Sequence, residues 1–159
     1  MSDALVFPME EQDIPAVSKM FIALHEHLNG LGSLFKLNPD WLSDYLHMML
    51  DSRLGRVIVL KLSDEVVGFI CVSTPIINKK FISEGSKNTG FISELFVDSA
   101  HRGKAYAKIL LSAAEDFFKS LNIRYMQVEV LVNNETAASL YKNYGFTPSY
   151  TNLYKNIQE

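Results

Sequence analysis

Apolar residues recur along this chain at two different spacings, which predict a mixture of helices and strands. From residue 14 onward they recur at helical spacing, and a second amphipathic stretch follows Asn38-Pro39. Asp13-Ile14-Pro15 combines an N-cap candidate with a proline in the first turn, and Asn38-Pro39 repeats this start signal. We therefore expect a short strand at 5–8 and then two amphipathic helices, the first ended by glycines 30 and 32.

The middle of the chain has the apolar runs that are typical of strands. Residues 56–62 and 66–74 flank the polar loop Ser63-Asp64-Glu65, which predicts a β-hairpin. Residues 78–90 are polar and contain Gly85 and Gly90, so we expect a flexible connection there. The next strand is expected at 91–97.

The last part of the chain predicts two more helices and two more strands. A long amphipathic helix is expected at 105–121, a strand at 125–132, a short helix at 134–144 and a last strand at 147–157. The strand–helix–strand unit at 91–132 implies a right-handed crossover between parallel neighbours. The element order β-α-α-β-β-β-α-β-α-β predicts one mixed α/β domain over residues 1–159.

Composition narrows the class of protein. The 159 residues are 48% hydrophobic and 21% charged, which is a globular balance. The net charge is −3 and no basic stripe is evident, so we expect no nucleic-acid partner. No apolar run is long enough to span a membrane and no secretory signal pattern opens the chain, so we expect no membrane partner and a cytoplasmic location.

Cysteine and histidine usage argues against disulfide and metal chemistry. Cys71 is the only cysteine in the sequence, and we interpret it as a small buried apolar residue. His25, His27 and His47 lack the spacing of metal ligands, so no metal is expected.

A small-residue turn opens the long helix. The turn reads Arg102-Gly103-Lys104-Ala105-Tyr106-Ala107. A helix N-terminus offers unpaired N–H groups and a partial positive charge, and small residues let a phosphate approach them. The turn is a candidate cradle for a pyrophosphate, although many such turns bind nothing. The nucleotide pattern Gly-x-x-x-x-Gly-Lys-Ser/Thr is absent.

Two motifs in order give this chain a resemblance to the GNAT superfamily of N-acetyltransferases over roughly residues 91–147. The first is Glu94-Leu95-Phe96-Val97 followed by the turn at 102–107, and the second is Asn134 followed by the Ala-x-x-Leu-Tyr-x-x-x-Gly-Phe stretch at 137–146. The family usually has Gly where this chain has Ala105. Ala costs little there if its φ is negative, but its methyl group would weaken binding if the diphosphate needs bare backbone.

The resemblance implies a fold and a cofactor. It implies a single-domain GNAT-like fold, with a mixed, mostly antiparallel sheet, splayed parallel central strands and about four flanking helices. It also implies acetyl-CoA as the acyl donor, with no metal. The cofactor-binding positions would be Leu95, Phe96 and Val97 for the pantetheine arm and acetyl carbonyl, Arg102, Gly103, Lys104, Ala105, Tyr106 and Ala107 for the pyrophosphate, and Asn134 and Tyr141 further along the arm.

Three side chains are candidates for proton transfer. Tyr141 would protonate the leaving thiolate, or it could be a core tyrosine that hydrogen-bonds a backbone carbonyl. An alkyl ammonium has a pKa near 10.4, so the acceptor must lose a proton before it attacks. Glu129, Glu94 or a water chain could take that proton. Phe35, Trp41 and Tyr45 could line the acceptor pocket or belong to the core.

The function implied is acetyl transfer from acetyl-CoA to a primary amine, by direct attack through a tetrahedral intermediate. A small-molecule amine is the leading acceptor. A protein N-terminus or lysine is an alternative, and a non-catalytic acyl-CoA-binding regulatory module is another. Dimers are common in this family, and the hairpin at 56–74 and the last strand are candidate edges for a homodimer.

Overall fold

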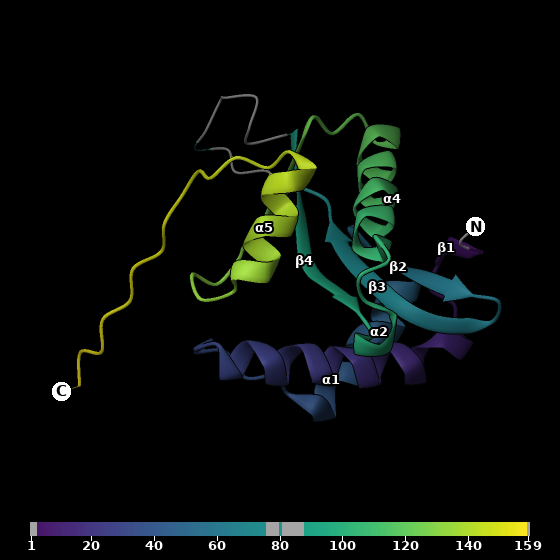
Figure 1. Cartoon of the computed structure of the whole chain (residues 1–159), viewed down its shortest axis with the longest axis horizontal. Helices are drawn as coiled ribbons and strands as arrows, with labels where there is room; N and C mark the ends of the chain where they lie inside the picture. Colours follow the sequence, from purple (N-terminus) through teal and green to yellow (C-terminus); the bar gives the residue numbers. More distant parts are fainter. Residues whose placement is uncertain (1–2, 76–79, 81–87, 159) are drawn as a thin grey trace.

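The computed structural model describes residues 3–75, 80 and 88–158. In these ranges a five-stranded sheet in the order β1-β2-β3-β4-β5 is flanked by four α-helices (Figure 1). The strands are β1 Ala4–Pro8, β2 Gly55–Leu62, β3 Glu65–Ser73, β4 Thr89–Val97 and β5 Tyr125–Val128. The helices are α1 Ile14–Gly30, α2 Pro39–Leu50, α4 Tyr106–Ser120 and α5 Glu135–Tyr144. The mixed α/β fold is confirmed.

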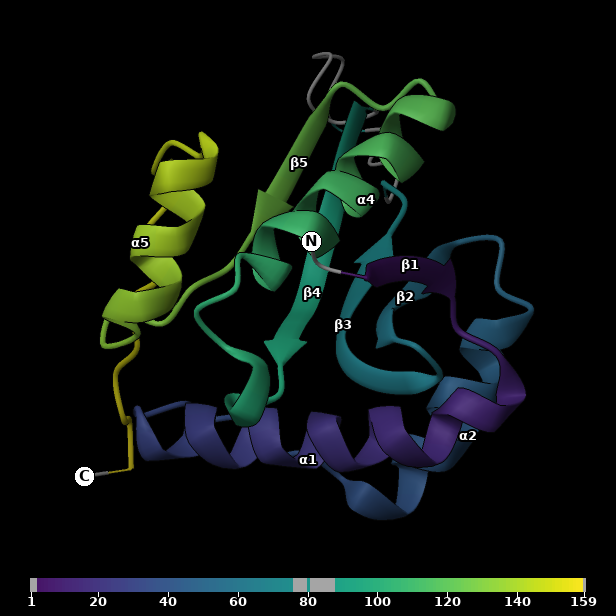
Figure 2. The ribbon, with the colours of Figure 1, turned by 45° about the vertical axis from the view of Figure 1, so that its right-hand side comes forward.

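The helices cover opposite faces of the sheet (Figure 2). One buried cluster joins the sheet to α4 and α5, and a second joins it to α1 and α2. Leu110 and Leu111 of α4 are fully buried in the first cluster, and Val17 and Leu46 are fully buried in the second. Because each helix presents one apolar stripe, burying these stripes supplies most of the driving force for the fold.

The two helix start signals in the sequence lie at the N-terminal ends of α1 and α2. Asn38 is the N-cap of α2, and its side chain accepts a hydrogen bond from the Asp40 N–H at 3.2 Å. Asp13 occupies the N-cap of α1 but makes no side-chain cap, and its carboxylate instead pairs with Lys61 of β2 at 2.7 Å. Proline 15 and proline 39 fall in the first turns, where their missing N–H has no partner to lose.

The strand pairing in the sheet changes from antiparallel to parallel at β4. Strands β1 to β4 pair antiparallel, whereas β4 and β5 pair parallel, as expected for the strand–helix–strand unit. The parallel pairing runs only from Thr89 and Tyr125 to Ile92 and Val128. Beyond that point β4 keeps β3 on one side, and on the other side residues 93–97 have no strand partner within the described ranges. The two parallel strands therefore part halfway along β4.

A register shift in β4 lies at this point of separation. Ile92 is opposite Val72 and Glu94 is opposite Cys71, so Ser93 is the extra residue of a β-bulge. In a regular strand Ile92 and Glu94 would share one face. Here Ile92 packs with the α4 cluster, whereas Phe96 packs with the α1 cluster. The bulge thus turns Glu94 and Phe96 toward α1.

Three expectations about the chain need correction or fall outside the structure. The predicted strand at 147–157 is wrong, because residues 147–158 form no strand and have exposed side chains. The strand expected at 125–132 ends at Val128. The connection expected at 78–90 lies largely outside the described residues, and its last two residues, Thr89 and Gly90, belong to β4. None of the described helices has the length and apolar composition of a membrane span.

Candidate functional site

The turn between β4 and α4 is held to the end of β4 by Arg102. Its Nε donates a hydrogen bond to the Val97 carbonyl at 3.0 Å, and its guanidinium lies over the Phe96 ring, 5.4 Å from the centroid. Asp98 supports the turn from the other side, because its carboxylate accepts the Ala100 N–H at 3.0 Å. The Arg102 side chain is therefore structural, and only its backbone remains available to the predicted cradle.

The backbone of the turn presents unpaired donors at the start of α4. The Ala105 carbonyl accepts the N–H groups of Lys108 and Ile109 at 3.0 and 3.3 Å. Within the described part of the chain, the N–H groups of Gly103, Lys104 and Ala107 have no acceptor. Nothing lies within 4 Å of the position that a Gly103 Cβ would take, so the surface here is open. Free N–H groups beside a helix N-terminus form a site suited to an anion.

Ala105 adopts the backbone conformation that is unfavourable for alanine. Its φ is +63° and its ψ is +16°, in the left-handed region. A side chain with a Cβ pays about 1 kcal/mol or more for this region, whereas glycine enters it freely. Ala105 therefore does not have the negative φ at which an alanine in this turn would cost little.

Beside the turn, the part of β4 that does not pair with β5 contains the predicted pantetheine-binding positions. Leu95, Phe96 and Val97 are all in the part of β4 that has lost β5. An extended chain containing amides can add to such an edge as a strand would. The Val97 carbonyl is already occupied by Arg102, so the backbone groups of Leu95 and Phe96 are the ones to consider.

Glu94 lies in a half-buried polar group on the α1 side of the sheet. Its Oε1 lies 3.8 Å from the His25 Nε2 of α1, and its Oε2 accepts a hydrogen bond from the Ser93 hydroxyl. Cys71 is directly opposite on β3. Burial, and then the neighbouring Glu94 carboxylate, raises the pKa of the Cys71 thiol. Burial, and then Cys71 and Glu94, likewise raises the pKa of Tyr45 on α2.

His25 and Tyr45 also lie near Glu94, and the sequence did not predict this arrangement. The His25 ring stacks on Phe21, with centroids 5.5 Å apart, and its Nε2 is buried without a hydrogen-bond partner in the described ranges. The spacing of four residues from Phe21 to His25 placed both on one side of α1. That spacing could have suggested the pair, but nothing in the sequence showed that β4 would present a carboxylate to it.

The other predicted side chains differ in their setting. Tyr141 is 9% exposed and packs edge-on against Phe146, with centroids 5.5 Å apart. Burial raises the pKa of Tyr141 to about 12. No hydrogen bond from its hydroxyl to a backbone carbonyl is present among the described residues. Asn134 is the N-cap of α5, and its side chain accepts the Ala137 N–H at 3.2 Å.

Glu129 is set apart from this group. It is exposed and lies just beyond the end of β5, whereas Glu94 is half-buried. No ion pair or hydrogen bond of its side chain occurs in the part of the chain that the structure describes. Of the predicted site positions, the structure therefore brings together the turn at 102–107, the unpaired edge of β4 and Glu94. Tyr141 shares a buried cluster with Ile92, Val97 and Tyr106.

The profile of the Acetyltransferase (GNAT) family matches residues 21–146, which include all of these positions. The chain belongs to the GNAT family. This confirms the resemblance stated from the two motifs, and it supports the expectation of an acetyl-CoA-dependent acetyltransferase.

Two N-acetyltransferases, one of them uncharacterized, are similar in sequence to this GNAT chain. The L-2,4-diaminobutyric acid acetyltransferase of Marinococcus halophilus is 29% identical over 104 residues, which are 65% of this chain and 56% of that enzyme. An uncharacterized N-acetyltransferase, YycN, of Bacillus subtilis (strain 168) is 28% identical over 111 residues, which are 69% of this chain and 67% of that protein. The match thus spans little more than half the length of the Marinococcus enzyme.

Solved structures share the fold of this GNAT domain at low identity. A tetramutant of the BH1408 protein from Bacillus halodurans superposes with a TM-score of 0.82 at 19% identity, covering 96% of this chain and 99% of that one. The aminoglycoside N-acetyltransferase AAC(6')-Iy in complex with CoA gives 0.78 at 14% identity, covering 96% and 93%. At this identity the likeness shows the fold alone.

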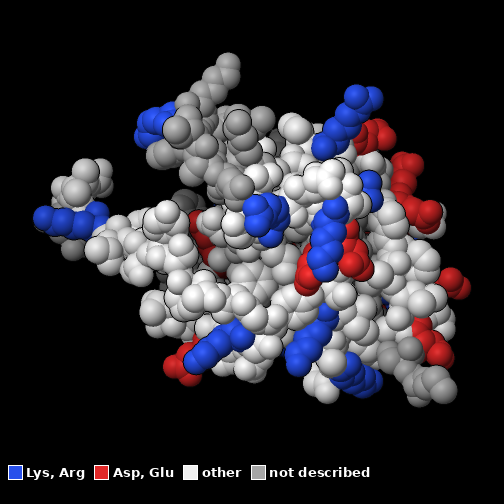
Figure 3. Space-filling model, turned by 90° about the horizontal axis from the view of Figure 1, so that it is seen from above, with Lys and Arg blue, Asp and Glu red and all other residues white. Residues whose placement is uncertain are grey.

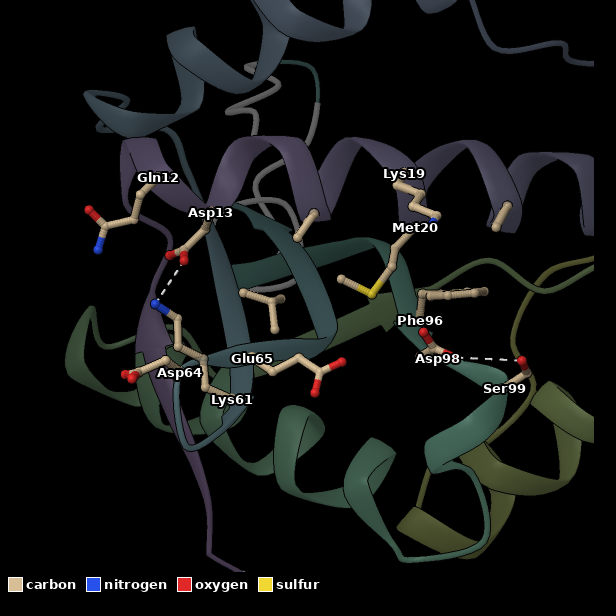
Figure 4. A pocket seen from close by; sticks show the side chains of 13 residues that line it. Gln12, Asp13, Lys19, Met20, Lys61, Asp64, Glu65, Phe96, Asp98 and Ser99 are labelled. Carbon is tan, nitrogen blue, oxygen red and sulfur yellow. Dashed lines mark hydrogen bonds and ion pairs between the residues drawn. The ribbon is translucent and has the colours of Figure 1, made fainter.

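A hollow of about 730 Å³ lies elsewhere on the domain, between α1 and the β2–β3 hairpin (Figure 4). The Asp13–Lys61 ion pair closes one end of it, and Phe96 and Asp98 lie at the other. Of the predicted site residues only Phe96 lines it, so it is distinct from the cradle and from Glu94.

The charged side chains do not form a field of one sign on the face seen in Figure 3. Lys and Arg are interspersed with Asp and Glu across its coloured part. Such a mixture attracts neither polyanions nor polycations strongly.

Proposed function

We propose that this chain transfers the acetyl group of acetyl-CoA to a primary amine of a small molecule. The observation that carries the proposal is that β4 and β5 part beside a turn with unpaired N–H groups. A phosphate and an extended thioester arm would both find partners there. The named relatives support a small acceptor, because one acetylates diaminobutyric acid and several fold neighbours are aminoglycoside acetyltransferases.

Acetyl-CoA fits the donors present. The unpaired N–H groups of Gly103, Lys104 and Ala107 would hold the pyrophosphate. The backbone of Leu95 and Phe96 would pair with the amides of the pantetheine arm. A backbone N–H of the same edge would bind the acetyl oxygen as negative charge develops on it, an effect worth about 3 kcal/mol.

The proposed reaction makes one bond and breaks one bond. The amine nitrogen attacks the thioester carbon, a C–N bond forms, and the C–S bond then breaks. Tyr141 would give its proton to the leaving sulfur, since a tyrosine phenol is protonated at neutral pH and burial raises the pKa of this one further, to about 12. The amine's own proton must leave to a base.

Glu94 is the better-supported base of the two carboxylates. It lies at the bulge where β4 loses its partner, on the α1 side, whereas Glu129 is exposed beyond β5. Tyr141 belongs to the cluster on the α4 and α5 side. An acceptor arriving from the α1 side would thus meet Glu94, while the thiolate leaves toward Tyr141. Proton transfer could be direct or through one water molecule.

Calorimetric titration with acetyl-CoA, free CoA and ATP tests the cofactor first. We expect micromolar binding of acetyl-CoA and CoA and no binding of ATP. A panel of small diamines, amino acids with a side-chain amine and amino sugars then tests turnover, beside lysine-containing peptides. Failure to bind acetyl-CoA would overturn the proposal, and turnover of peptides alone would replace the small acceptor with a protein.

A further inference from the structure

Acetyl transfer to an amine releases one proton for each turnover. An alkyl amine enters mainly as the ammonium ion at neutral pH, because its pKa is near 10.4. The products are a neutral amide and a neutral thiol, so one proton is left over and has to reach the solvent. Tyr141 gives a proton to the sulfur and must recover one, so it is not the net carrier. The remaining proton would first be held by Glu94, the better-supported base.

The Glu94 carboxylate has little direct contact with water. Only 15% of its side chain is exposed. Its Oε2 accepts the Ser93 hydroxyl, and its Oε1 faces the His25 Nε2 of α1, which crosses the C-terminal end of β4 (Figure 2). The 3.8 Å between Oε1 and Nε2 is longer than a hydrogen bond, and it suits a contact that shortens when substrate binds or that one water molecule bridges. A proton on Oε1 would therefore leave toward α1.

The imidazole of His25 is held with one nitrogen directed at this carboxylate. Its Nε2 is buried and has no hydrogen-bond partner among the described residues. A buried polar atom without a partner is costly, which calls for an explanation in function. The ring stacks on Phe21, with centroids 5.5 Å and planes 14° apart, and Phe21 stacks in turn on Phe69 of β3. This stack limits the orientations that the imidazole can adopt.

The His25 side chain also reaches a small hollow beside α1. This hollow, which we call the His25 hollow, has a volume of about 230 Å³, and its polar lining consists of His25, Glu26, Asn29 and Lys36. Glu26 and Lys36 are exposed and of opposite charge, so neither sign dominates. The His25 side chain is 21% exposed although its Nε2 is buried, so its exposed part lies away from Glu94. A polar hollow of this size has room for several water molecules.

Two other titratable groups lie close to Glu94, and both are poor carriers of a proton. Burial, and then the Glu94 carboxylate, raises the pKa of the Cys71 thiol on β3. Burial, and then Cys71 and Glu94, raises the pKa of the Tyr45 phenol on α2. Both groups therefore keep their own proton at neutral pH and do not take up a second one. Imidazole, in contrast, gains and releases protons readily near neutral pH.

We propose that His25 relays the proton from Glu94 to water in the His25 hollow, a role that rests on the acetyl transfer proposed for this chain. The Nε2 of the neutral imidazole accepts the proton of the Glu94 carboxyl group, and Nδ1 gives its own proton to water. This step regenerates the carboxylate for the next amine, and only O–H and N–H bonds are broken or formed. The ring, now protonated on Nε2, returns to its first tautomer by exchanging protons with water between turnovers.

Removal and chemical rescue of the imidazole test the relay, with an amine that the wild-type chain acetylates. His25→Ala should lower kcat by about tenfold or more in a weakly buffered solution, and added imidazole should restore most of it. Imidazoles of increasing basicity should rescue increasingly well, a dependence that repair of the fold would not produce. His27→Ala is the matched control, because His27 is an exposed histidine of the same helix. It should keep the wild-type kcat and not respond to imidazole.

His25→Gln separates proton transfer from folding. Glutamine keeps a polar group beside Glu94 but carries no proton at neutral pH. This variant should bind acetyl-CoA as wild type does in calorimetry, unfold at a similar denaturant concentration, and lose kcat as His25→Ala does. A wild-type kcat in His25→Gln, or a loss in His25→Ala that no imidazole restores, would overturn the relay and leave the proposed function standing. A wild-type chain that neither binds acetyl-CoA nor acetylates any amine would overturn the proposed function and the relay with it.

Discussion

At the level of single residues, Ala105 has the least favourable backbone conformation near the candidate site. Ala105→Gly should raise the free energy of unfolding by about 1 kcal/mol, because glycine adopts a φ of +63° without a Cβ clash. Denaturant unfolding measures this. Ala107→Gly, inside the first turn of α4, is the control and should be destabilising. A loss of stability in Ala105→Gly would show that the left-handed conformation is not held in solution.

The phenol of Tyr141 is proposed to protonate the leaving thiolate. Tyr141→Phe should lower kcat by about 100-fold, because loss of a general acid typically costs that much, while the Kd for acetyl-CoA stays within threefold. Steady-state kinetics and calorimetry measure the two quantities. Tyr144→Phe removes a hydroxyl from the same helix, one that donates to Glu115 at 2.8 Å, and should leave kcat unchanged. Equal turnover in Tyr141→Phe and wild type would reassign the acid.

The two carboxylates can be separated by their pH dependence. Glu94→Gln should lower kcat/KM by about 100-fold or more and remove the acidic limb of its pH profile, since the amide cannot accept the proton. Glu129→Gln should preserve both the rate and the limb. If Glu129→Gln removes the limb instead, the base lies beyond β5, and if neither does, water carries the proton.

At the level of elements, the contact between β4 and α4 depends on Gly90. A Cβ at this position would lie 2.2 Å from the Phe118 ring of α4. Gly90→Ala should therefore lower the free energy of unfolding by about 1–3 kcal/mol, because the ring or the strand must shift. Thermal and denaturant unfolding measure the change. Gly30→Ala, where nothing lies within 4 Å, should be neutral or stabilising.

Local sequence signals were enough to predict some of the helices and strands but not all of them. Caps and periodicity predicted the α1 and α2 starts, the hairpin and α4 to within a residue or two, because those signals are local. The bulge at Ser93 could not be foreseen, since it depends on the pairing of β3 with β4. For the same reason Glu94 was placed in the right strand without its partner His25. The prediction of a strand at 147–157 is wrong because pairing with a sheet edge depends on tertiary contacts, which local β-propensity does not show.

At the level of the whole molecule, buried tyrosines make stability sensitive to alkali. In the unfolded chain Tyr141 should lose its proton near pH 10, whereas in the folded chain its pKa is raised to about 12. Between these values the unfolded state binds fewer protons, so stability falls as the pH rises, by up to about 1.4 kcal/mol per pH unit for one group.

Unfolding free energies measured from pH 8 to pH 12 test this sensitivity. Tyr141→Phe should make the alkaline decline shallower than in wild type, and Tyr45, whose pKa is also raised by burial, should contribute part of the remainder. Tyr150→Phe is the control, because its ring is 91% exposed, and it should leave the decline as it is. An identical decline in Tyr141→Phe would mean that its ring is hydrated in the folded state.

The strands stand in the sheet in the same order as they occur in the chain. Each pairing therefore joins consecutive strands, and no earlier strand must wait for a later one to be inserted between it and its neighbour. Sheets with such sequential contacts tend to fold quickly, and parallel pairings form more slowly than hairpins. During synthesis the antiparallel strands β1 to β4 can pair first, and the short parallel pairing of β4 with β5 is added last. A chain released before β5 would therefore contain the turn at 102–107 and the edge of β4, but it would lack Asn134 and Tyr141.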